Sequence, residues 1–132
     1  MKRQYIIAIA FILGCQHFAS AQQNKKSVHD DPVKVVKVIF TAAKTGNYSL
    51  LSGLCDPTGN SDGDTKTLCS MRDQPQATKD EFRMYFKNGR VIGKATIKGD
   101  GAKVKIKFGP DGKKDEEFKL MRLNGKWYIV SY

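Results

Sequence analysis

The second half of the chain alternates apolar and charged residues with a period of two, and this pattern constrains the fold more than any other feature. Val104, Ile106 and Phe108 alternate strictly with three lysines, so one face of this segment is apolar and the other is basic. Turns rich in glycine divide the region into expected strands over 91–98, 102–108, 115–123 and 126–132. The pattern predicts a four-stranded antiparallel meander.

The first half of the chain carries the spacing of an amphipathic helix instead. Asp30 or Asp31 can cap a helix that starts at Pro32 and ends before the Gly46-Asn47 pair. Valine, isoleucine and phenylalanine side chains follow one stripe of this segment, and lysines lie opposite. We expect this helix to pack its apolar stripe against the sheet.

Two further helices are expected between the first helix and the strands. A short one covers 47–54, and a polar loop follows over 55–76. Thr78 and Glu81 form a capping box for a third helix, which stops at Asn88-Gly89. Helices followed by an antiparallel meander predict an α+β fold with the helices on one face of the sheet.

The first 21 residues have the pattern of an export signal. Two basic residues precede an unbroken apolar run over 6–13, and Ala19-Ser20-Ala21 matches the small-x-small site of a signal peptidase. The run is shorter than the roughly 20 residues that span a bilayer. The expected organisation is a signal peptide over 1–21, a flexible leader over 22–29 and one domain over 30–132.

An alternative processing route starts from Cys15. The run Ile12-Leu13-Gly14-Cys15 resembles a bacterial lipobox, in which the cysteine is acylated and anchors the protein in the envelope. Under this alternative the protein associates with the outer membrane. Both routes place the domain outside the inner membrane, as a periplasmic, secreted or lipid-anchored protein.

Cys55 and Cys69 remain after cleavage, and an exported protein with two such cysteines is expected to join them in a disulfide. A redox or metal pair would need a Cys-x-x-Cys spacing or nearby histidines, and the mature chain holds only His29. The run 60–64 resembles part of a calcium loop but would place Thr58 and Cys69 at its key ligand positions, which favours a solvated turn. We expect no metal and no cofactor.

Two segments resemble the nuclear transport factor 2-like superfamily, in its small exported or lipoprotein bacterial members. The run DPVKVVKVIFTAAKTGNYSLLSGL is similar to the family's opening helices, and LMRLNGKWYIVSY is similar to its terminal hairpin. The matching residues are Gly46, Asn47, Tyr48, Gly125, Trp127 and Ile129. The resemblance implies a cystatin-like α+β cone, whose sheet curls around the first helix and leaves a cavity. Members of this family often dimerise through the sheet, so a homodimer is a further expectation.

The same scaffold hosts isomerases, dehydratases, polyketide cyclases and non-catalytic binding modules, so the resemblance does not choose among them. An enzyme of the isomerase or dehydratase type needs a pocket base, for which Tyr48, Asp56 and Tyr85 are weak candidates. The aromatic residues that could line a ligand cavity, or fill the core, are Phe40, Phe82, Phe86, Phe118 and Trp127. We expect a non-catalytic binding module for a small molecule or an envelope protein.

The chain is strongly basic, with a formal net charge of +10, and its composition excludes a wholly disordered or collagen-like protein. The lysines expected on the solvent side of the sheet are Lys94, Lys98, Lys103, Lys105 and Lys107. They either keep the sheet soluble or bind an anionic polymer or lipid headgroup. Export argues against nucleic acid as the partner, and the strands lack the interleaved aromatic residues of a stacking platform.

Overall fold

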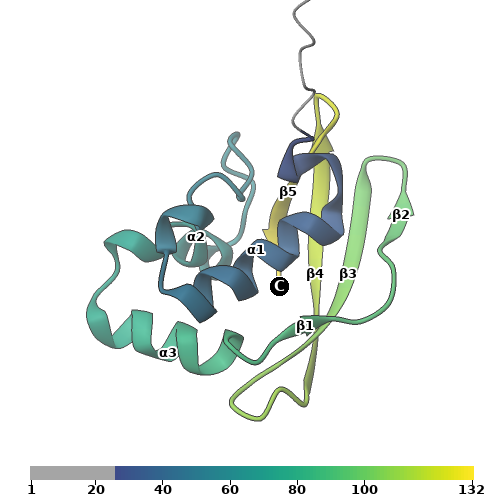
Figure 1. Ribbon diagram of the computed structural model, residues 1–132. Helices are drawn as coiled ribbons and strands as arrows, with labels where there is room; N and C mark the ends of the chain where they lie inside the picture. The colour runs from purple at the N-terminus through teal and green to yellow at the C-terminus, as the bar shows by residue number, and fades with distance from the viewer. Residues whose placement is uncertain (1–25) are drawn as a thin grey trace, which may run out of the picture.

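The structure, a computed structural model, describes residues 26–132, so the expected signal peptide and Cys15 lie outside the described residues. Three α-helices pack on one face of an antiparallel sheet (Figure 1). The helices are α1 (Pro32–Thr45), α2 (Gly63–Cys69) and α3 (Gln76–Phe86). The strands are β1 (Arg90–Val91), β2 (Thr96–Lys98), β3 (Gly101–Phe108), β4 (Lys114–Leu123) and β5 (Lys126–Ser131). The predicted α+β class is confirmed.

Helix α1 begins and ends where its capping residues predict. The carboxylate of Asp31 accepts a hydrogen bond from the backbone N–H of Val33 at 2.9 Å, and Pro32 is the first helical residue. At the other end Gly46 adopts a left-handed conformation with φ 72°, and its N–H donates to the carbonyl of Ala42. The lysine face of α1 points to solvent, while the opposite face is buried against the sheet.

The core lies between α1, α3 and the face of the sheet that the helices cover, which we call the inner face. Its fully buried side chains include Val35, Val36, Ile39, Val104, Ile106, Phe118 and Ile129. On β3 the period-two pattern is confirmed, because the apolar residues are buried and the lysines lie on the opposite, outer face. Among the helices that the structure describes, none is both long and apolar enough to cross a membrane.

The expected strand over 91–98 is interrupted, which corrects the sequence prediction. Its two ends form β1 and β2, and both pair with β3 in antiparallel fashion. Between them Gly93 takes a φ of +68°, a conformation that a regular strand does not contain. The sheet order is therefore β1-β3-β4-β5, with β2 as a second partner of β3.

The last hairpin follows its turn signal, but the end of β5 departs from simple alternation. Asn124 and Gly125 both have positive φ, as a two-residue type I′ turn requires. Farther along, Leu120 pairs with Ile129 while Lys119 pairs with Ser131, so β5 carries one extra residue at this point. This bulge turns Tyr132 to the inner face, where its ring stacks on Phe118 with centroids 5.0 Å apart. Simple alternation would have placed Tyr132 on the outer face beside Tyr128.

The segment 55–76, expected as a loop, contains α2 and a 3-10 turn, η3 (Met71–Asp73). Asp62 caps α2 by accepting a hydrogen bond from the N–H of Thr65 at 2.8 Å. The helix buries Thr65 and Leu68, and the predicted Cys55–Cys69 disulfide joins its last residue to Cys55, which forms an isolated parallel bridge with Ile129 of β5. Polar composition concealed this helix because it is short and buries few residues.

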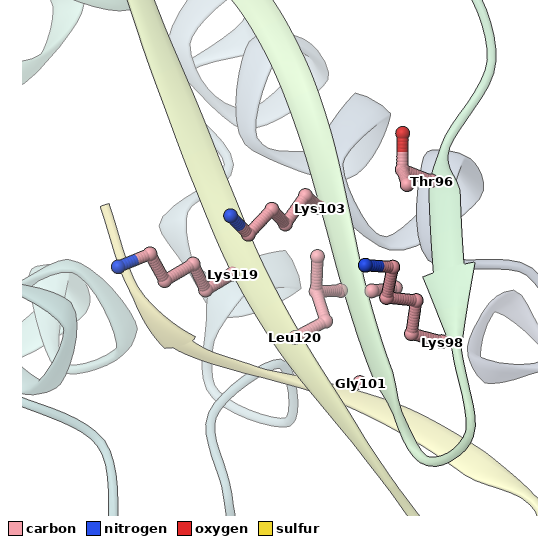
Figure 2. A pocket seen from close by; sticks show the side chains of 7 residues that line it. Thr96, Lys98, Gly101, Lys103, Lys119 and Leu120 are labelled. Atoms are coloured by element: carbon pink, nitrogen blue, oxygen red, sulfur yellow. The ribbon is translucent and has the colours of Figure 1, made fainter.

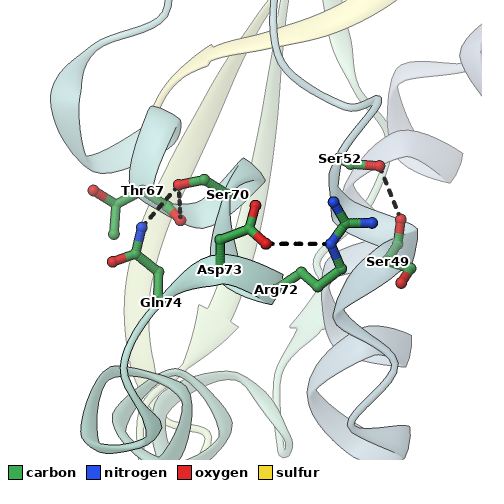
Figure 3. A network of polar contacts seen from close by, with 7 residues as sticks. All are labelled: Ser49, Ser52, Thr67, Ser70, Arg72, Asp73 and Gln74. Atoms are coloured by element: carbon green, nitrogen blue, oxygen red, sulfur yellow. Dashed lines mark hydrogen bonds and ion pairs between the residues drawn. The ribbon is translucent and has the colours of Figure 1, made fainter.

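The link from α2 to α3 is held by local polar contacts (Figure 3). The amide of Gln74 donates to the hydroxyl of Ser70 at 2.9 Å, and Arg72 forms an exposed ion pair with Asp73 at 3.4 Å. Helix α3 begins directly after Pro75 without a side-chain cap, so the predicted capping box of Thr78 and Glu81 is not formed. Both residues lie inside the helix instead.

The last residues of the expected leader contact the sheet. Val28–Asp30 form a 3-10 turn, η1, in which Ser27 accepts a hydrogen bond from the N–H of His29. The Nδ1 atom of His29 lies 2.8 Å from the carbonyl oxygen of Trp127, and its ring packs on Tyr128. These residues therefore pack against the end of β5.

Candidate functional site

A hollow of about 280 Å³ opens between α2, α3 and the inner face of the sheet, and we call it the acidic cavity. Its walls combine aromatic rings with oxygen-bearing side chains. The lining residues are Asp64, Thr67, Leu68, Met71, Thr78, Glu81, Phe82, Tyr85, Phe86, Phe108 and Tyr132. None of these described lining residues is basic, although the chain as a whole carries a net charge of +10.

Four separate structural features bring these residues together. The Asp62 cap and the disulfide hold α2, which supplies Asp64. Helix α3 presents Glu81 and Phe86 on neighbouring turns, with Phe86 buried. The bulge in β5 turns Tyr132 inward, and its ring meets that of Phe86 edge-on at 6.0 Å. The cavity is thus a product of tertiary structure and not of one sequence motif.

Four carboxylates act on the phenol of Tyr132 in the acidic cavity. Burial, followed by the charges of Asp64, Asp62, Glu116 and Glu81, raises the pKa of Tyr132 to about 12. The phenol is therefore neutral at physiological pH and can both donate and accept a hydrogen bond. The carboxylates of Asp64 and Glu81 are exposed at the rim. Together these groups offer acceptor oxygens above an aromatic wall.

The three weak catalytic candidates do not share a site. Tyr85 lines the acidic cavity, whereas Tyr48 and Asp56 do not. Tyr48 packs edge-on against Phe82, with the ammonium group of Lys79 over its ring at 5.6 Å.

Asp56 acts as the centre of a tight turn. One carboxylate oxygen accepts hydrogen bonds from the backbone N–H and the hydroxyl of Thr58, and the other accepts from the N–H of Asn60. These hydrogen bonds, with the Thr58 hydroxyl first, lower the pKa of Asp56 against the opposing effect of burial. A carboxylate that is occupied and acidified in this way is a poor general base.

The five aromatic residues expected as a ligand lining are divided among three places. Phe82 and Phe86 line the acidic cavity. Phe40 borders a separate hollow beside Gly89, where its ring occupies the space that a side chain at residue 89 would need. Phe118 and Trp127 belong to the core, with exposed fractions of 0% and 3%.

Carboxylates on β4 partly neutralise the lysines of the outer face. Lys107 forms an ion pair with Asp115 at 2.6 Å, and Lys103 lies 3.6 Å from Glu117. Lys105 stands opposite Glu117 in the β3–β4 register. Lys94 lies in the interruption between β1 and β2, outside the strands. The surface predicted to be basic therefore carries both lysines and carboxylates along β3 and β4.

A second hollow, which we call the basic hollow, is lined by three lysines, of which only Lys103 has an ion-pair partner in the part of the chain that the structure describes (Figure 2). It measures about 310 Å³ and crosses β2, β3 and β4. Its lining residues are Thr96, Lys98, Gly101, Ala102, Lys103, Lys119 and Leu120. Lys98 and Lys103 were expected on this face, whereas Lys119 was not singled out by the sequence analysis.

Within residues 26–132, no group of three or more potential metal-ligating side chains comes together. The run that resembles part of a calcium loop serves other roles, since Asp62 caps α2 and Asn60 contacts the Asp56 turn. Among the cavity residues that sequence reasoning missed, those with acidic or phenolic groups are Asp64, Glu81 as a rim residue, and Tyr132. A short capped helix signal at Asp62 was the only sequence trace of the first, and the bulge that positions Tyr132 left no sequence signal.

No protein-family model matches this chain, and no curated protein matches it in sequence. Two solved structures are similar in fold. One, from Campylobacter jejuni and described as an NTF2-like transpeptidase, is 19% identical, with a TM-score of 0.49 over 76% of this chain and 97% of that chain. The other, a SEC-C motif containing protein from Rhodopseudomonas palustris, is 14% identical, with a TM-score of 0.44 over 77% of each chain. The α+β architecture of this chain rests on its own helices and sheet.

Proposed function

We propose that this protein is a non-catalytic binding module that holds a small molecule in the acidic cavity. The observation that carries the proposal is the chemistry of the lining, which is aromatic and acidic in an otherwise basic chain. Concave, largely apolar hollows with a few converging polar groups are where proteins bind small ligands. The ligand that fits has an apolar or aromatic body and a positively charged group.

Each part of such a ligand has a counterpart in the cavity. Phe82 and Phe86, each 5% exposed, form part of an apolar wall against which an aromatic body can pack. The carboxylates of Asp64 and Glu81 can accept hydrogen bonds from an ammonium group at the rim. The neutral phenol of Tyr132 supplies a further polar contact on the inner side.

The enzyme alternative has less support from the same residues. A pocket base needs a carboxyl or imidazole held in apolar surroundings, where its pKa is matched to proton transfer. The two carboxylates of the cavity are exposed, and Asp56 lies outside it with its oxygens bound to the backbone. The raised pKa of Tyr132 also keeps this residue protonated.

Three small probes with the same aromatic body test the proposal: tyramine, which is a cation, 4-ethylphenol, which is neutral, and 4-hydroxyphenylacetate, which is an anion. We expect tyramine to bind most tightly, with amide chemical-shift changes centred on α3 and the end of β5. Removing both rim charges with Asp64→Asn and Glu81→Gln is expected to weaken tyramine binding about tenfold. Titration calorimetry measures the affinity.

Asp80→Asn is the matched control for these substitutions, because Asp80 lies on the same helix but does not line the cavity. It should leave the affinity for tyramine unchanged. Equal binding of the three probes would contradict the proposed cationic ligand. Shifts confined to residues outside the cavity would contradict the site itself.

We further propose that the domain works in an oxidising compartment outside the cytoplasm, as a soluble or lipid-anchored envelope protein. The Cys55–Cys69 disulfide supports this proposal, because such bonds persist mainly in exported proteins. The intact mass of the protein recovered from its own cells tests the route. A chain that starts at Gln22 and lacks two hydrogens supports soluble export, whereas acyl mass on a chain starting at Cys15 supports the lipid anchor. A mass that retains residue 1 contradicts both.

A further inference from the structure

The outer face of the sheet places two lysines directly opposite each other with no carboxylate in their row. Thr96 pairs with Lys103 on the next strand, and Lys103 pairs with Lys119 on the strand after it. Like charges directly opposite in an antiparallel pair are destabilising, so this row lowers the stability of the sheet. The next two outer-face rows toward the end of β3 avoid the problem, because Lys105 stands opposite Glu117 and Lys107 stands opposite Asp115.

A third ammonium group meets this row from the side. Lys98 stands opposite Gly101 in the β2–β3 register, one row away from Lys103 on the same face. Asp100 is the carboxylate nearest to Lys98 in sequence, and it is held by Arg122 at 3.2 Å. Within residues 26–132 neither Lys98 nor Lys119 has an ion-pair partner, and the contact of Lys103 with Glu117 is long, at 3.6 Å.

Gly101 provides the room between these side chains. Because it has no side chain, the outer face is hollowed at this position, and Figure 2 shows Lys98, Lys103 and Lys119 extending across the sheet in the same direction, one from each of β2, β3 and β4. A methyl group built on Gly101 would meet only the carbonyl oxygen of Lys98, at 3.5 Å, so the space beside it is open. The hydroxyl of Thr96 lies at the edge of the same hollow and can donate a hydrogen bond.

We propose that the basic hollow is a binding site for a phosphate group. A phosphate oxyanion carries enough negative charge to neutralise several ammonium groups at once and enough acceptor oxygens to bind each of them. Its binding would remove the like-charge repulsion between Lys103 and Lys119, so the arrangement is unfavourable when empty and favourable when filled. This site is separate from the acidic cavity and lies on the other face of the sheet.

The test titrates the full chain with inorganic phosphate at a constant ionic strength set by chloride. Lys119→Gln removes one of the two opposed charges and is expected to raise the dissociation constant about tenfold. Lys105→Gln is the matched control, since it removes the same charge from the same face at a position opposite Glu117. We expect it to change the dissociation constant by less than about twofold.

The variant Gly101→Val distinguishes phosphate binding in the hollow from binding by surface charge alone. It fills the floor of the hollow without altering any charge, and a β-branched residue suits a strand. Thermal unfolding confirms that the variant is folded, and phosphate binding is then expected to be lost. Equal weakening by Lys119→Gln and Lys105→Gln, or unchanged binding in Gly101→Val, would overturn the proposal, because diffuse surface charge would then account for the binding.

A second arm of the experiment distinguishes the source of the phosphate group. Vesicles of phosphatidylglycerol diluted in phosphatidylcholine present the group in a lipid headgroup, and cosedimentation measures binding. Binding to vesicles but not to free phosphate, with loss in Lys119→Gln and Gly101→Val, assigns the site to a membrane lipid. Binding to free phosphate alone assigns it to a soluble phosphate compound. Failure of both ligands to bind the unmodified chain overturns the site.

Discussion

The acidic cavity and the basic hollow lie on opposite faces of the same sheet, and they are built in different ways. The acidic cavity needs α2, α3, the disulfide and the bulge in β5 to bring its residues together. The basic hollow needs little more than the pairing register of β2, β3 and β4. A site of the first kind is sensitive to how the helices dock, whereas a site of the second kind persists as long as the sheet does.

Removing the disulfide should affect ligand binding at the two sites most differently. Replacing both Cys55 and Cys69 with serine frees the end of α2, and loss of a crosslink over a loop of this size is expected to lower the free energy of unfolding by about 3 kcal/mol. Urea unfolding measures this loss. Well below the unfolding midpoint we expect tyramine binding to be weakened and phosphate binding to be retained.

The control for this experiment is the unmodified protein with its disulfide intact, measured in the same buffer without reductant. Equal losses of tyramine and phosphate binding would contradict the comparison, because the basic hollow would then also depend on the position of α2.

The Asp56 turn supports the cavity side of the molecule through β5, since the N–H of Asp56 donates to the carbonyl of Ile129. Asp56→Asn turns one acceptor oxygen into a donor that faces the N–H of Asn60, at an expected cost of about 1–2 kcal/mol at neutral pH. The pKa of Asp56 is lowered in the folded state, so its contribution is present above the ordinary value near 4 and is lost as the pH falls through the folded pKa. The stability difference between the two proteins should therefore shrink below about pH 4. Urea unfolding across this range measures it, and a difference that grows in acid would contradict the turn assignment.

Removing a buried hydroxyl in α2 is expected to raise the free energy of unfolding, in contrast to the two changes above. The Oγ1 atom of Thr65 is fully buried and has no hydrogen-bond partner among the residues that the structure describes. Thr65→Val keeps the shape and removes the unpaired polar atom, so we expect a gain of about 1 kcal/mol in the free energy of unfolding. Thr67→Val on the same helix is the control, because the Thr67 hydroxyl donates to the carbonyl of Gly63 and is exposed. A loss in Thr65→Val would show that the hydroxyl is hydrogen-bonded, for example to a buried water.

The two regions also differ in how far the sequence predicts them. Local signals placed α1 and the last hairpin, because Asp31, Pro32 and the Asn124-Gly125 turn act through their own backbone conformations. The lysines of the outer face followed from alternation, but their neutralisation by β4 depends on register, which alternation alone does not fix. The acidic cavity was predicted only in part, through Phe82, Phe86 and Tyr85. Asp64 and Tyr132 are brought to it by a short helix and a bulge, whose positions are decided by packing and not by local preference.

The smallest predicted effect is the change in stability when the repulsion between Lys103 and Lys119 in the basic hollow is removed. Lys119→Glu places a carboxylate opposite Lys103, so the opposed pair becomes attractive and the protein should gain about 0.5 kcal/mol at low salt. Lys105→Glu makes the same change in net charge but sets a glutamate opposite Glu117, and a loss of similar size is expected. Urea unfolding in chloride buffer measures both, and high salt should reduce both effects through screening. A shift in the same direction for the two variants would contradict the register-based account. If Lys119→Glu instead stabilises the fold and abolishes phosphate binding, the natural lysine lowers stability while serving a ligand, which is the behaviour expected of a functional residue.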